Sequence, residues 1–189
     1  MANSADDDSV MWVSPKSRGI IPLENLHISK SLRRKLSSEK YHSTFNKDFF
    51  KVVSHGRNRK ETWINNILVD SYIELHKKKF AHSVEIWLGE ELVGGLFGVS
   101  IGACFFGESM FSLKNDGSKL ALVSIINRLK SCGHKLFDTQ FFTPHLGSMG
   151  GIEISKIKYE KILKANITKN VKFKHTDYEK EFLFIPKKN

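Results

Sequence analysis

The pattern of hydrophobic and polar positions predicts strands in the middle of the chain. Residues 83–88 alternate between the two kinds, and residues 92–101 and 104–111 are apolar runs rich in strand-forming side chains. Gly89-Glu90 and Gly102-Ala103 separate these runs and predict hairpin turns. The three runs therefore predict consecutive strands at the centre of a sheet.

Apolar residues recur at helical spacing on both sides of these strands. Before them, Ser29 is a candidate N-cap for a helix that ends near Leu36. After them, residues 119–131 are apolar on nearly all sides, which predicts a helix buried against the sheet, and Gly133 ends it. The other predicted helices cover residues 46–53, with Phe49, Phe50 and Val53 inward, residues 62–80, and residues 155–164, with Ile157 inward.

A further strand is predicted at residues 136–141, directly after the buried helix. The order strand, helix, strand predicts a right-handed crossover that places this strand parallel to residues 104–111. Short strands are predicted at residues 11–15, 18–22 and 182–185, and a Gly-rich loop at residues 144–151.

The composition adds a strong positive charge to this picture. The 189 residues carry a formal net charge of +10, which favours a polyanionic partner, nucleic acid above all. A basic soluble protein without such a partner is the alternative. An apolar content of 40%, with 14 Phe, is enough for the core of one domain.

Several classes of protein are disfavoured by what the sequence contains. Cys104 and Cys132 have no cluster of His or further Cys residues around them, so we expect reduced thiols and no metal site. The apolar runs are shorter than a membrane span, and the first residues are acidic rather than apolar. We therefore expect a cytoplasmic protein.

The first predicted helix carries a basic face. Lys30, Arg33 and Arg34 lie three and four residues apart, so they share one exposed side. Lys40 extends the patch, and Glu39 is the first acid after it begins. A merely solvated face is the common alternative, but the run without an acid favours phosphate binding.

Three polar residues stand inside predicted strands. Glu108 interrupts an apolar run, where a charge is costly unless it has a partner or a function. Asp138 and Gln140 are two positions apart, so regular alternation places them on one face. An edge strand or an exposed sheet face is the alternative. The functional interpretation is a wet cleft at the strand end, in which Asp138 orients Gln140.

Several segments together resemble the leucyl/phenylalanyl-tRNA–protein transferases. The most specific are Phe106-Gly107-Glu108-Ser109-Met110-Phe111-Ser112 and the downstream Asp138-Thr139-Gln140. The other matching segments are residues 26–29, 62–64, 82–87, 92–99, 118–119, Gly133 and residues 145–150, so that the resemblance covers residues 11–165.

The resemblance implies both a fold and an activity. The fold is α/β (α+β), an acyl-CoA N-acetyltransferase-like mixed sheet flanked by helices. The activity is transfer of Leu, Phe or Met from aminoacyl-tRNA to the N-terminal amine of an acceptor protein that begins with Arg or Lys, which marks that protein for degradation. The implied partners are aminoacyl-tRNA and such acceptors, with no membrane, and the expected state is a monomer. Because the ester to tRNA is already activated, no ATP, metal, CoA or other cofactor is needed, and catalysis is largely positioning.

The resemblance also assigns roles to individual residues. Asp138 and Gln140 would act at the ester, where the Gln140 carbonyl can accept a hydrogen bond from the attacking amine. Trp63 would bind the terminal adenosine, and the basic helix would hold the acceptor stem. The pocket for the aminoacyl side chain would consist of Leu96, Phe105, Gly107, Glu108, Met110 and Leu129, and the tRNA contacts would come from Lys30, Arg33 and Arg34.

The chain departs from the family in two places. Family members have a small N-terminal domain with a Gly-Ile-Phe-Pro-Trp segment whose Trp also contacts the adenosine, and this chain lacks that segment. We therefore expect residues 1–25 to be a remnant of the N-terminal region and residues 26–189 to form the acetyltransferase-like domain. Two further basic positions of the tRNA-binding helix are Ser37 and Ser38 here.

Two other functions stay open at this point. One is a tRNA-binding homologue that is non-catalytic or uses a different acceptor. The other is a CoA-dependent N-acetyltransferase, which usually carries a Gln/Arg-x-x-Gly-x-Gly/Ala loop for the pyrophosphate. Asn115-Asp116-Gly117-Ser118 does not match that loop, and its carboxylate would repel a pyrophosphate.

Overall fold

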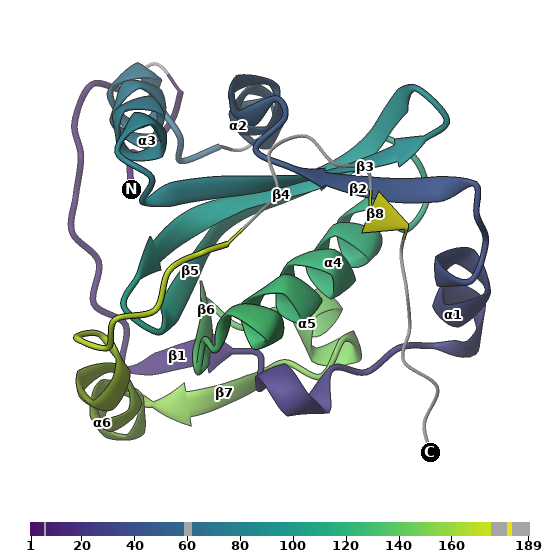
Figure 1. The fold of residues 1–189 in the computed structure, drawn as a ribbon. Helices are drawn as coiled ribbons and strands as arrows, with labels where there is room; N and C mark the ends of the chain where they lie inside the picture. The colour runs from purple at the N-terminus through teal and green to yellow at the C-terminus, as the bar shows by residue number, and fades with distance from the viewer. Residues whose placement is uncertain (6, 59–61, 175–180, 183–189) are drawn as a thin grey trace.

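The part of the chain that the structure describes folds around one mixed sheet of eight strands, with helices on both faces (Figure 1). The computed structural model describes residues 1–5, 7–58, 62–174 and 181–182. The strand order is β7-β1-β6-β5-β4-β3-β2-β8, and β5 and β6 are parallel while the other neighbours are antiparallel. The strands are β1 (Ser17–Ile20), β2 (Tyr41–Phe45), β3 (Ala81–Leu88), β4 (Glu91–Ile101), β5 (Cys104–Ser112), β6 (Leu136–Gln140), β7 (Ile152–Ser155) and β8 (Glu181–Phe182). The helices are the 3-10 helix η1 (Leu23–Asn25), α1 (Lys30–Leu36), α2 (Phe49–Arg57), α3 (Asn66–Lys77), α4 (Gly117–Cys132), α5 (Pro144–Ser148) and α6 (Lys156–Asn166).

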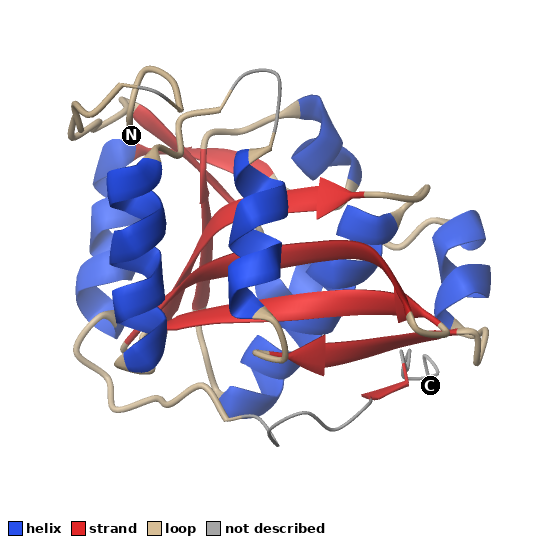
Figure 2. Cartoon of the chain, turned by 90° about the horizontal axis from the view of Figure 1, so that it is seen from above, coloured by secondary structure: helices blue, strands red, loops and turns tan. Residues whose placement is uncertain are grey.

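The helices cover the sheet in two layers. Helices α2 and α3 lie on one face, and α4, with α1 and α5 beside it, lies on the other (Figures 1 and 2). Alternate residues of β4 face the two layers, so Leu96 packs in the α4 layer and Phe97 in the layer of α2 and α3. This arrangement confirms the predicted fold class, and it explains why β4 is apolar at nearly every position.

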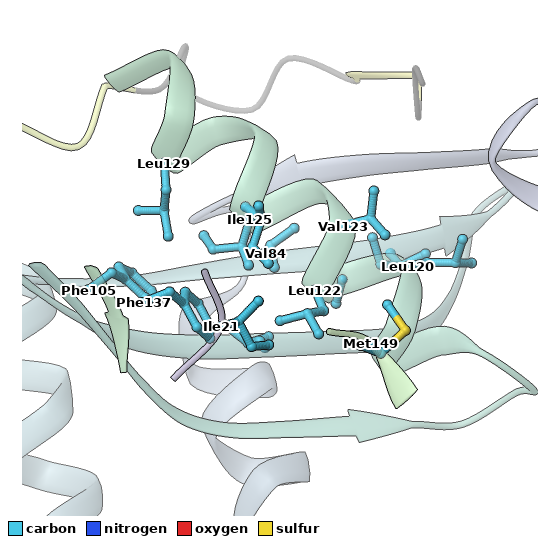
Figure 3. Close-up of a cluster of buried hydrophobic side chains, with 14 of the residues drawn as sticks. Ile21, Val84, Phe105, Leu120, Leu122, Val123, Ile125, Leu129, Phe137 and Met149 are labelled. Atoms are coloured by element: carbon cyan, nitrogen blue, oxygen red, sulfur yellow. The ribbon is translucent and has the colours of Figure 1, made fainter. Parts of the chain in front are cut away.

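The larger hydrophobic core lies between α4 and the sheet. Figure 3 shows Leu122, Ile125 and Leu129 of α4 in this cluster together with Val84 and other side chains of the strands. Helix α4 begins directly against β4, since a Cβ added to Gly94 would lie 2.4 Å from the backbone of Gly117. Glycine at this contact therefore allows the close approach of helix and strand.

The central predictions are confirmed. The strands β3, β4 and β5 follow one another through the two predicted hairpin turns. The Ser29 hydroxyl accepts a hydrogen bond from the backbone N–H of Leu32 and caps α1, and Gly133 ends α4 with φ of 88°. The crossover through α4 also places β6 parallel to β5.

Four predictions about single segments are wrong. Residues 11–15 form no strand, and the backbone N–H of Met11 donates to the carbonyl of Met1 instead. The loop predicted at 144–151 contains the short helix α5, capped by the Thr143 side chain. Phe50 is 61% exposed and Ile157 is 83% exposed, because the neighbouring Phe49 and Tyr159 occupy the faces of α2 and α6 that pack inward.

Helix α3 is shorter than predicted, since it begins at Asn66 rather than at residue 62 and ends before Phe80. The Asn65 side chain caps it by accepting from the N–H of Leu68. Of the strand predicted at 182–185, Phe182 lies in β8, and residues 183–185 fall outside the described residues.

Candidate active site

The sheet splits between β5 and β6, and this split opens the candidate site. The two parallel strands pair from Cys104 and Leu136 as far as Phe106 and Asp138. Strand β5 continues to Ser112, well beyond the last residue that pairs with β6. A cavity of about 1350 Å³ lies along this split and is lined from both faces of the sheet. We call it the β5–β6 cavity.

Most side chains on the wall of the β5–β6 cavity are apolar. Leu96 of β4 and Met110 of β5, both assigned to the aminoacyl pocket by the resemblance, lie on the wall. Leu122 of α4 and Phe137 of β6 join them. A wall of this kind holds an apolar side chain by burial rather than by hydrogen bonds.

Two residues assigned to the same pocket lie behind its wall. Phe105 has no exposed surface, and its ring stacks on that of Phe137 with centroids 5.6 Å apart. Leu129 is also fully buried, in the core between α4 and the sheet. Both therefore support the wall rather than line it.

Glu108 is a carboxylate on the wall, beside Gly107. Its Oε2 accepts a hydrogen bond of 2.8 Å from the hydroxyl of Tyr72, which α3 supplies. Burial raises the pKa of Glu108 from 4.5 to about 7, although the bond from Tyr72 works against this rise. Burial and the neighbouring carboxylate also raise the pKa of Tyr72, so its hydroxyl remains a donor. Glu108 is therefore poised between its two protonation states near neutral pH.

Asp138 is fully buried at the point where β5 and β6 separate. Arg18 of β1 donates to it from Nε, at 3.0 and 3.1 Å to the two oxygens, and from Nη2 at 2.8 Å. Tyr159 of α6 donates from its hydroxyl at 2.5 Å. The backbone N–H of Gln140 donates to Oδ1 at 2.7 Å. The buried charge thus has a cation and several donors, as its burial requires.

Gln140 lies on the wall of the cavity at the end of β6, in an unusual backbone conformation. Its φ is 58°, in the left-handed region that a residue other than Gly seldom adopts. The pairing with β1 also slips here, since Ile20 faces Asp138 while Gly19 faces Gln140. The extra residue between them, Thr139, makes a bulge, a feature that re-aims side chains near functional sites.

This geometry changes one prediction about the pair. Regular alternation would give Asp138 and Gln140 a common face, but the bulge and the left-handed turn break the alternation. Asp138 is buried behind the cavity and Gln140 lies on its wall. The hydrogen bond between them joins the carboxylate to the backbone of Gln140 rather than to its side chain.

The close packing at the bulge depends on a glycine. A Cβ added to Gly19 would lie 2.7 Å from the Thr139 hydroxyl and 2.8 Å from the backbone of Phe141. A side chain at this position would therefore push β1 away from the end of β6.

The partners of the two carboxylates were not predicted from the sequence. Tyr72 lies inside the helix predicted at residues 62–80, where nothing local marks it as a donor to Glu108, and Arg18 and Tyr159 lie 120 and 21 residues away from Asp138. One general signal was available, because an Asp in a buried strand needs a cation. That signal alone does not say which basic residue supplies it.

The residues assigned to tRNA lie on two different parts of the surface. Trp63 is partly buried on the cavity wall, just before α3, and its carbonyl accepts the backbone N–H of Ala2. Lys30, Arg33 and Arg34 are exposed on α1, which lies at the far side of α4 from β1 and α6 (Figure 1). The structure therefore brings Trp63 to the cavity and leaves the basic helix outside it.

Within the described residues, no group of three or more His, Cys, Asp or Glu side chains could hold a metal ion. No helix in the same part of the chain combines the length and the apolar character of a membrane span.

Two solved structures overlap with part of the fold. The C-terminal DUF2156 domain of a protein from Agrobacterium fabrum matches 70% of this chain and 51% of its own, with a TM-score of 0.45 and 10% identity. L-PGS from Bacillus licheniformis matches 70% of this chain and 50% of its own, with a TM-score of 0.46 and 16% identity. At these TM-scores the likeness carries no argument about the site.

Similarity in sequence is much stronger. The family model described as leucyl/phenylalanyl-tRNA protein transferase matches residues 20–164. A leucyl/phenylalanyl-tRNA–protein transferase of Ruegeria sp. is 52% identical over 163 residues, which are 86% of this chain and 78% of the relative. Relatives of the same name from Dinoroseobacter shibae and Cereibacter sphaeroides are 48% and 46% identical, and the matches cover 89% and 94% of this chain and 75% and 83% of theirs. By these matches the chain belongs to the leucyl/phenylalanyl-tRNA–protein transferase family.

Proposed function

We propose that this protein transfers a leucyl, phenylalanyl or methionyl group from aminoacyl-tRNA to the N-terminal amine of an acceptor protein that begins with Arg or Lys. The observation that carries the proposal is the apolar β5–β6 cavity with Gln140 at its wall, in a chain of this family. We further propose that the transfer marks the acceptor for degradation, and that the enzyme acts as a monomer in the cytoplasm, where charged tRNA is available.

The aminoacyl side chain occupies the apolar part of the cavity. Leu96 and Met110 contact it directly, while Phe105 and Leu129 hold the wall from behind. Gly107 leaves room beside Phe137, since a Cβ added there would lie 3.0 Å from its ring. A pocket without hydrogen bonds to the side chain distinguishes Leu from Val by only about 10- to 200-fold.

The reaction exchanges an ester for an amide. The acceptor nitrogen attacks the ester carbonyl carbon, a C–N bond forms, and the C–O bond to the terminal ribose of the tRNA breaks. The amine loses one proton and the departing ribose oxygen gains one. Because the ester is already activated, the main task of the enzyme is to hold the two reactants in line.

Gln140 is the residue that we assign to the reacting amine. Its side-chain carbonyl accepts a hydrogen bond from the amine and aims the nitrogen lone pair at the ester. Asp138 acts through Gln140, by holding its backbone N–H. Glu108, with its pKa near 7, is the carboxylate on the wall that changes charge in the working range.

The tRNA is held at two places. Trp63 at the cavity wall offers a ring for the terminal adenosine, and the basic face of α1, with Lys30, Arg33 and Arg34, contacts the phosphates of the acceptor stem. The division into an N-terminal region of residues 1–25 and a transferase domain of residues 26–189 remains part of this proposal. The strand β1 belongs to the first part and pairs with β6 and β7 of the second.

The experiment that tests the proposal is transfer of a labelled amino acid from Leu-tRNA to peptides that differ only in their first residue. We expect transfer to peptides that begin with Arg or Lys. Binding of Leu-tRNA without transfer to any peptide would indicate a non-catalytic tRNA-binding homologue. Transfer to peptides with other first residues would indicate an altered acceptor specificity.

A further inference from the structure

The carboxylate of Asp138 has little capacity left for a reacting group. Oδ1 accepts from Arg18 Nε and from the backbone N–H of Gln140. Oδ2 accepts from Arg18 at Nε and Nη2 and from the hydroxyl of Tyr159. A carboxylate has about four lone-pair sites, and these contacts occupy both oxygens. Asp138 therefore serves as an anchor rather than as a proton acceptor.

Asp138 holds Gln140, whose backbone conformation is unfavourable. Gln140 has φ of 58°, which an L-residue adopts only when its surroundings hold it there. The bond from its N–H to Asp138 is charge-assisted and 2.7 Å long. It comes directly before the chain leaves β6, so it fixes the direction in which Gln140 leaves the strand.

Arg18 and Tyr159 come from elements on the side of β6 that faces away from β5. Strand β1 supplies Arg18 and helix α6 supplies Tyr159. The guanidinium also lies over the Tyr159 ring, 5.1 Å from its centroid. The two side chains thus brace each other as well as the carboxylate, and they hold it from two directions.

We propose that Arg18 and Tyr159 are positioning residues for aminoacyl transfer, which act by fixing Asp138 and through it the left-handed backbone of Gln140. This inference rests on the proposed function, because it needs Gln140 to contact the reacting amine. Tyr159 is buried and does not line the cavity, whereas Arg18 also lies on the cavity wall, and the role that we propose for both is to hold Asp138. The prediction is a loss of rate that depends on Gln140 being present.

The main variant is Tyr159→Phe, which keeps the ring beside Arg18 and removes one donor to Asp138. We expect single-turnover transfer to fall roughly 10-fold, with unchanged affinity for Leu-tRNA, since a small misplacement of a reacting group is costly. Arg18→Lys keeps the charge but loses the bidentate hydrogen bonds to Asp138, so we expect the transfer rate to fall by roughly 10- to 100-fold. The matched control is Tyr41→Phe on β2, which three strands separate from β6 in the sheet, and this variant should transfer at the wild-type rate.

A double-mutant cycle separates positioning from general damage. In a Gln140→Ala background, Tyr159→Phe should have little further effect, within about 2-fold, because its effect passes through Gln140. An equal loss in both backgrounds would overturn the inference, and so would a wild-type rate for Tyr159→Phe and Arg18→Lys.

A third measurement needs no variant. Hydrogen exchange of the Gln140 amide in the wild-type protein should be strongly slowed, because its N–H is bonded to a buried carboxylate. Exchange at the rate of an unprotected amide would also overturn the inference. If the wild-type protein transfers no amino acid although this amide is protected, the proposed function fails while the anchoring contact stands.

Discussion

Two strands of the sheet each carry a carboxylate in an apolar setting, and the two differ in what surrounds them. Glu85 of β3 is fully buried and accepts from the hydroxyls of Ser83 at 2.5 Å and Thr44 at 2.6 Å, and from the N–H of Lys47 at 3.3 Å. Glu108 of β5 accepts from Tyr72 and lies on the wall of the β5–β6 cavity. Burial raises the pKa of both.

The difference lies in the sheet around the two strands. Strand β3 is paired with β4 along its whole length and with β2 from Val84 to Leu88, so Glu85 has a strand on each side and its bonds complete a closed core. Strand β5 loses β6 as a partner after Phe106, and Glu108 follows two residues later. A buried carboxylate is therefore not by itself a sign of function. Its place relative to the break in the sheet separates a structural charge from one that can meet a ligand.

The largest expected effect is that of Gln140→Ala on the open side of the sheet. The change removes the hydrogen bond that we assign to the attacking amine, so single-turnover transfer should fall by roughly 10²-fold or more with little change in tRNA binding. Thr44→Ala, on the closed side, should transfer at the wild-type rate. Transfer at the wild-type rate by Gln140→Ala would show that the residue is only part of a polar patch on the cavity wall.

Asp138→Asn should show the second-largest effect, and in two measurements. The amide keeps the shape but loses the charge that holds Arg18, so the transfer rate should fall by roughly 10- to 100-fold. The free energy of unfolding should also fall, by about 3 kcal/mol, because a partly buried guanidinium loses its counter-charge. Denaturant titration and single-turnover kinetics on the same sample measure both. An unchanged unfolding midpoint would contradict the anchoring role of Asp138.

The pattern of the sequence was sufficient for the central hairpins and for α4, because alternation and helical spacing are local signals. It was also sufficient to single out Glu108, Asp138 and Gln140 as polar positions in apolar strands. It could not identify Arg18 or Tyr159 as partners of Asp138, because residues that lie 120 and 21 positions apart produce no recognisable pattern in the sequence between them.

Two other errors have a different physical origin. The left-handed backbone of Gln140 was invisible because such positions are usually marked by Gly or Asn. The inward assignments of Phe50 and Ile157 failed because a neighbouring aromatic side chain took the buried face of each helix. An apolar residue near a helix start does not reveal which of two nearby positions faces the core.

A smaller effect is expected outside the cavity, on α1. Binding of aminoacyl-tRNA should have a log–log salt slope of about −3 to −5, from roughly three to five phosphate contacts. Replacing Lys30, Arg33 and Arg34 together by Ala should make that slope shallower by about 3. The same triple change on the lysines at 77–79, at the C-terminal end of α3 on the other face, provides a control. A slope that stays the same in the α1 variant would refute the assignment of the basic helix.

The smallest expected effect is a pH dependence of stability that comes from Glu108. Its folded pKa lies above its ordinary value, so the folded state binds the proton more tightly than the unfolded chain. The contribution of Glu108 to the free energy of unfolding is therefore fully present below about pH 4.5 and is lost as the pH rises to about 7. For a pKa shift of this size the contribution is at most about 3 kcal/mol. Glu108→Gln keeps an acceptor for Tyr72 and should remove this part of the pH dependence.

Urea titrations of the wild type and of Glu108→Gln, at pH 5 and pH 8, measure that difference. The free energy of unfolding of the variant should fall less between the two pH values than that of the wild type. Identical pH profiles would mean that Glu108 is ionised throughout and better solvated than its surroundings indicate.

The most direct test of the whole scheme is the transfer of labelled leucine from Leu-tRNA to a peptide beginning with Arg, compared with the same peptide acetylated at its N-terminus. We expect a new amide bond at the free amine, no product with the acetylated peptide, and no requirement for ATP, CoA or metal. The wild-type protein should form this product at least 10²-fold faster than Gln140→Ala. Tight binding of Leu-tRNA without any labelled peptide, or equal labelling of the acetylated peptide, would contradict aminoacyl transfer to the N-terminal amine.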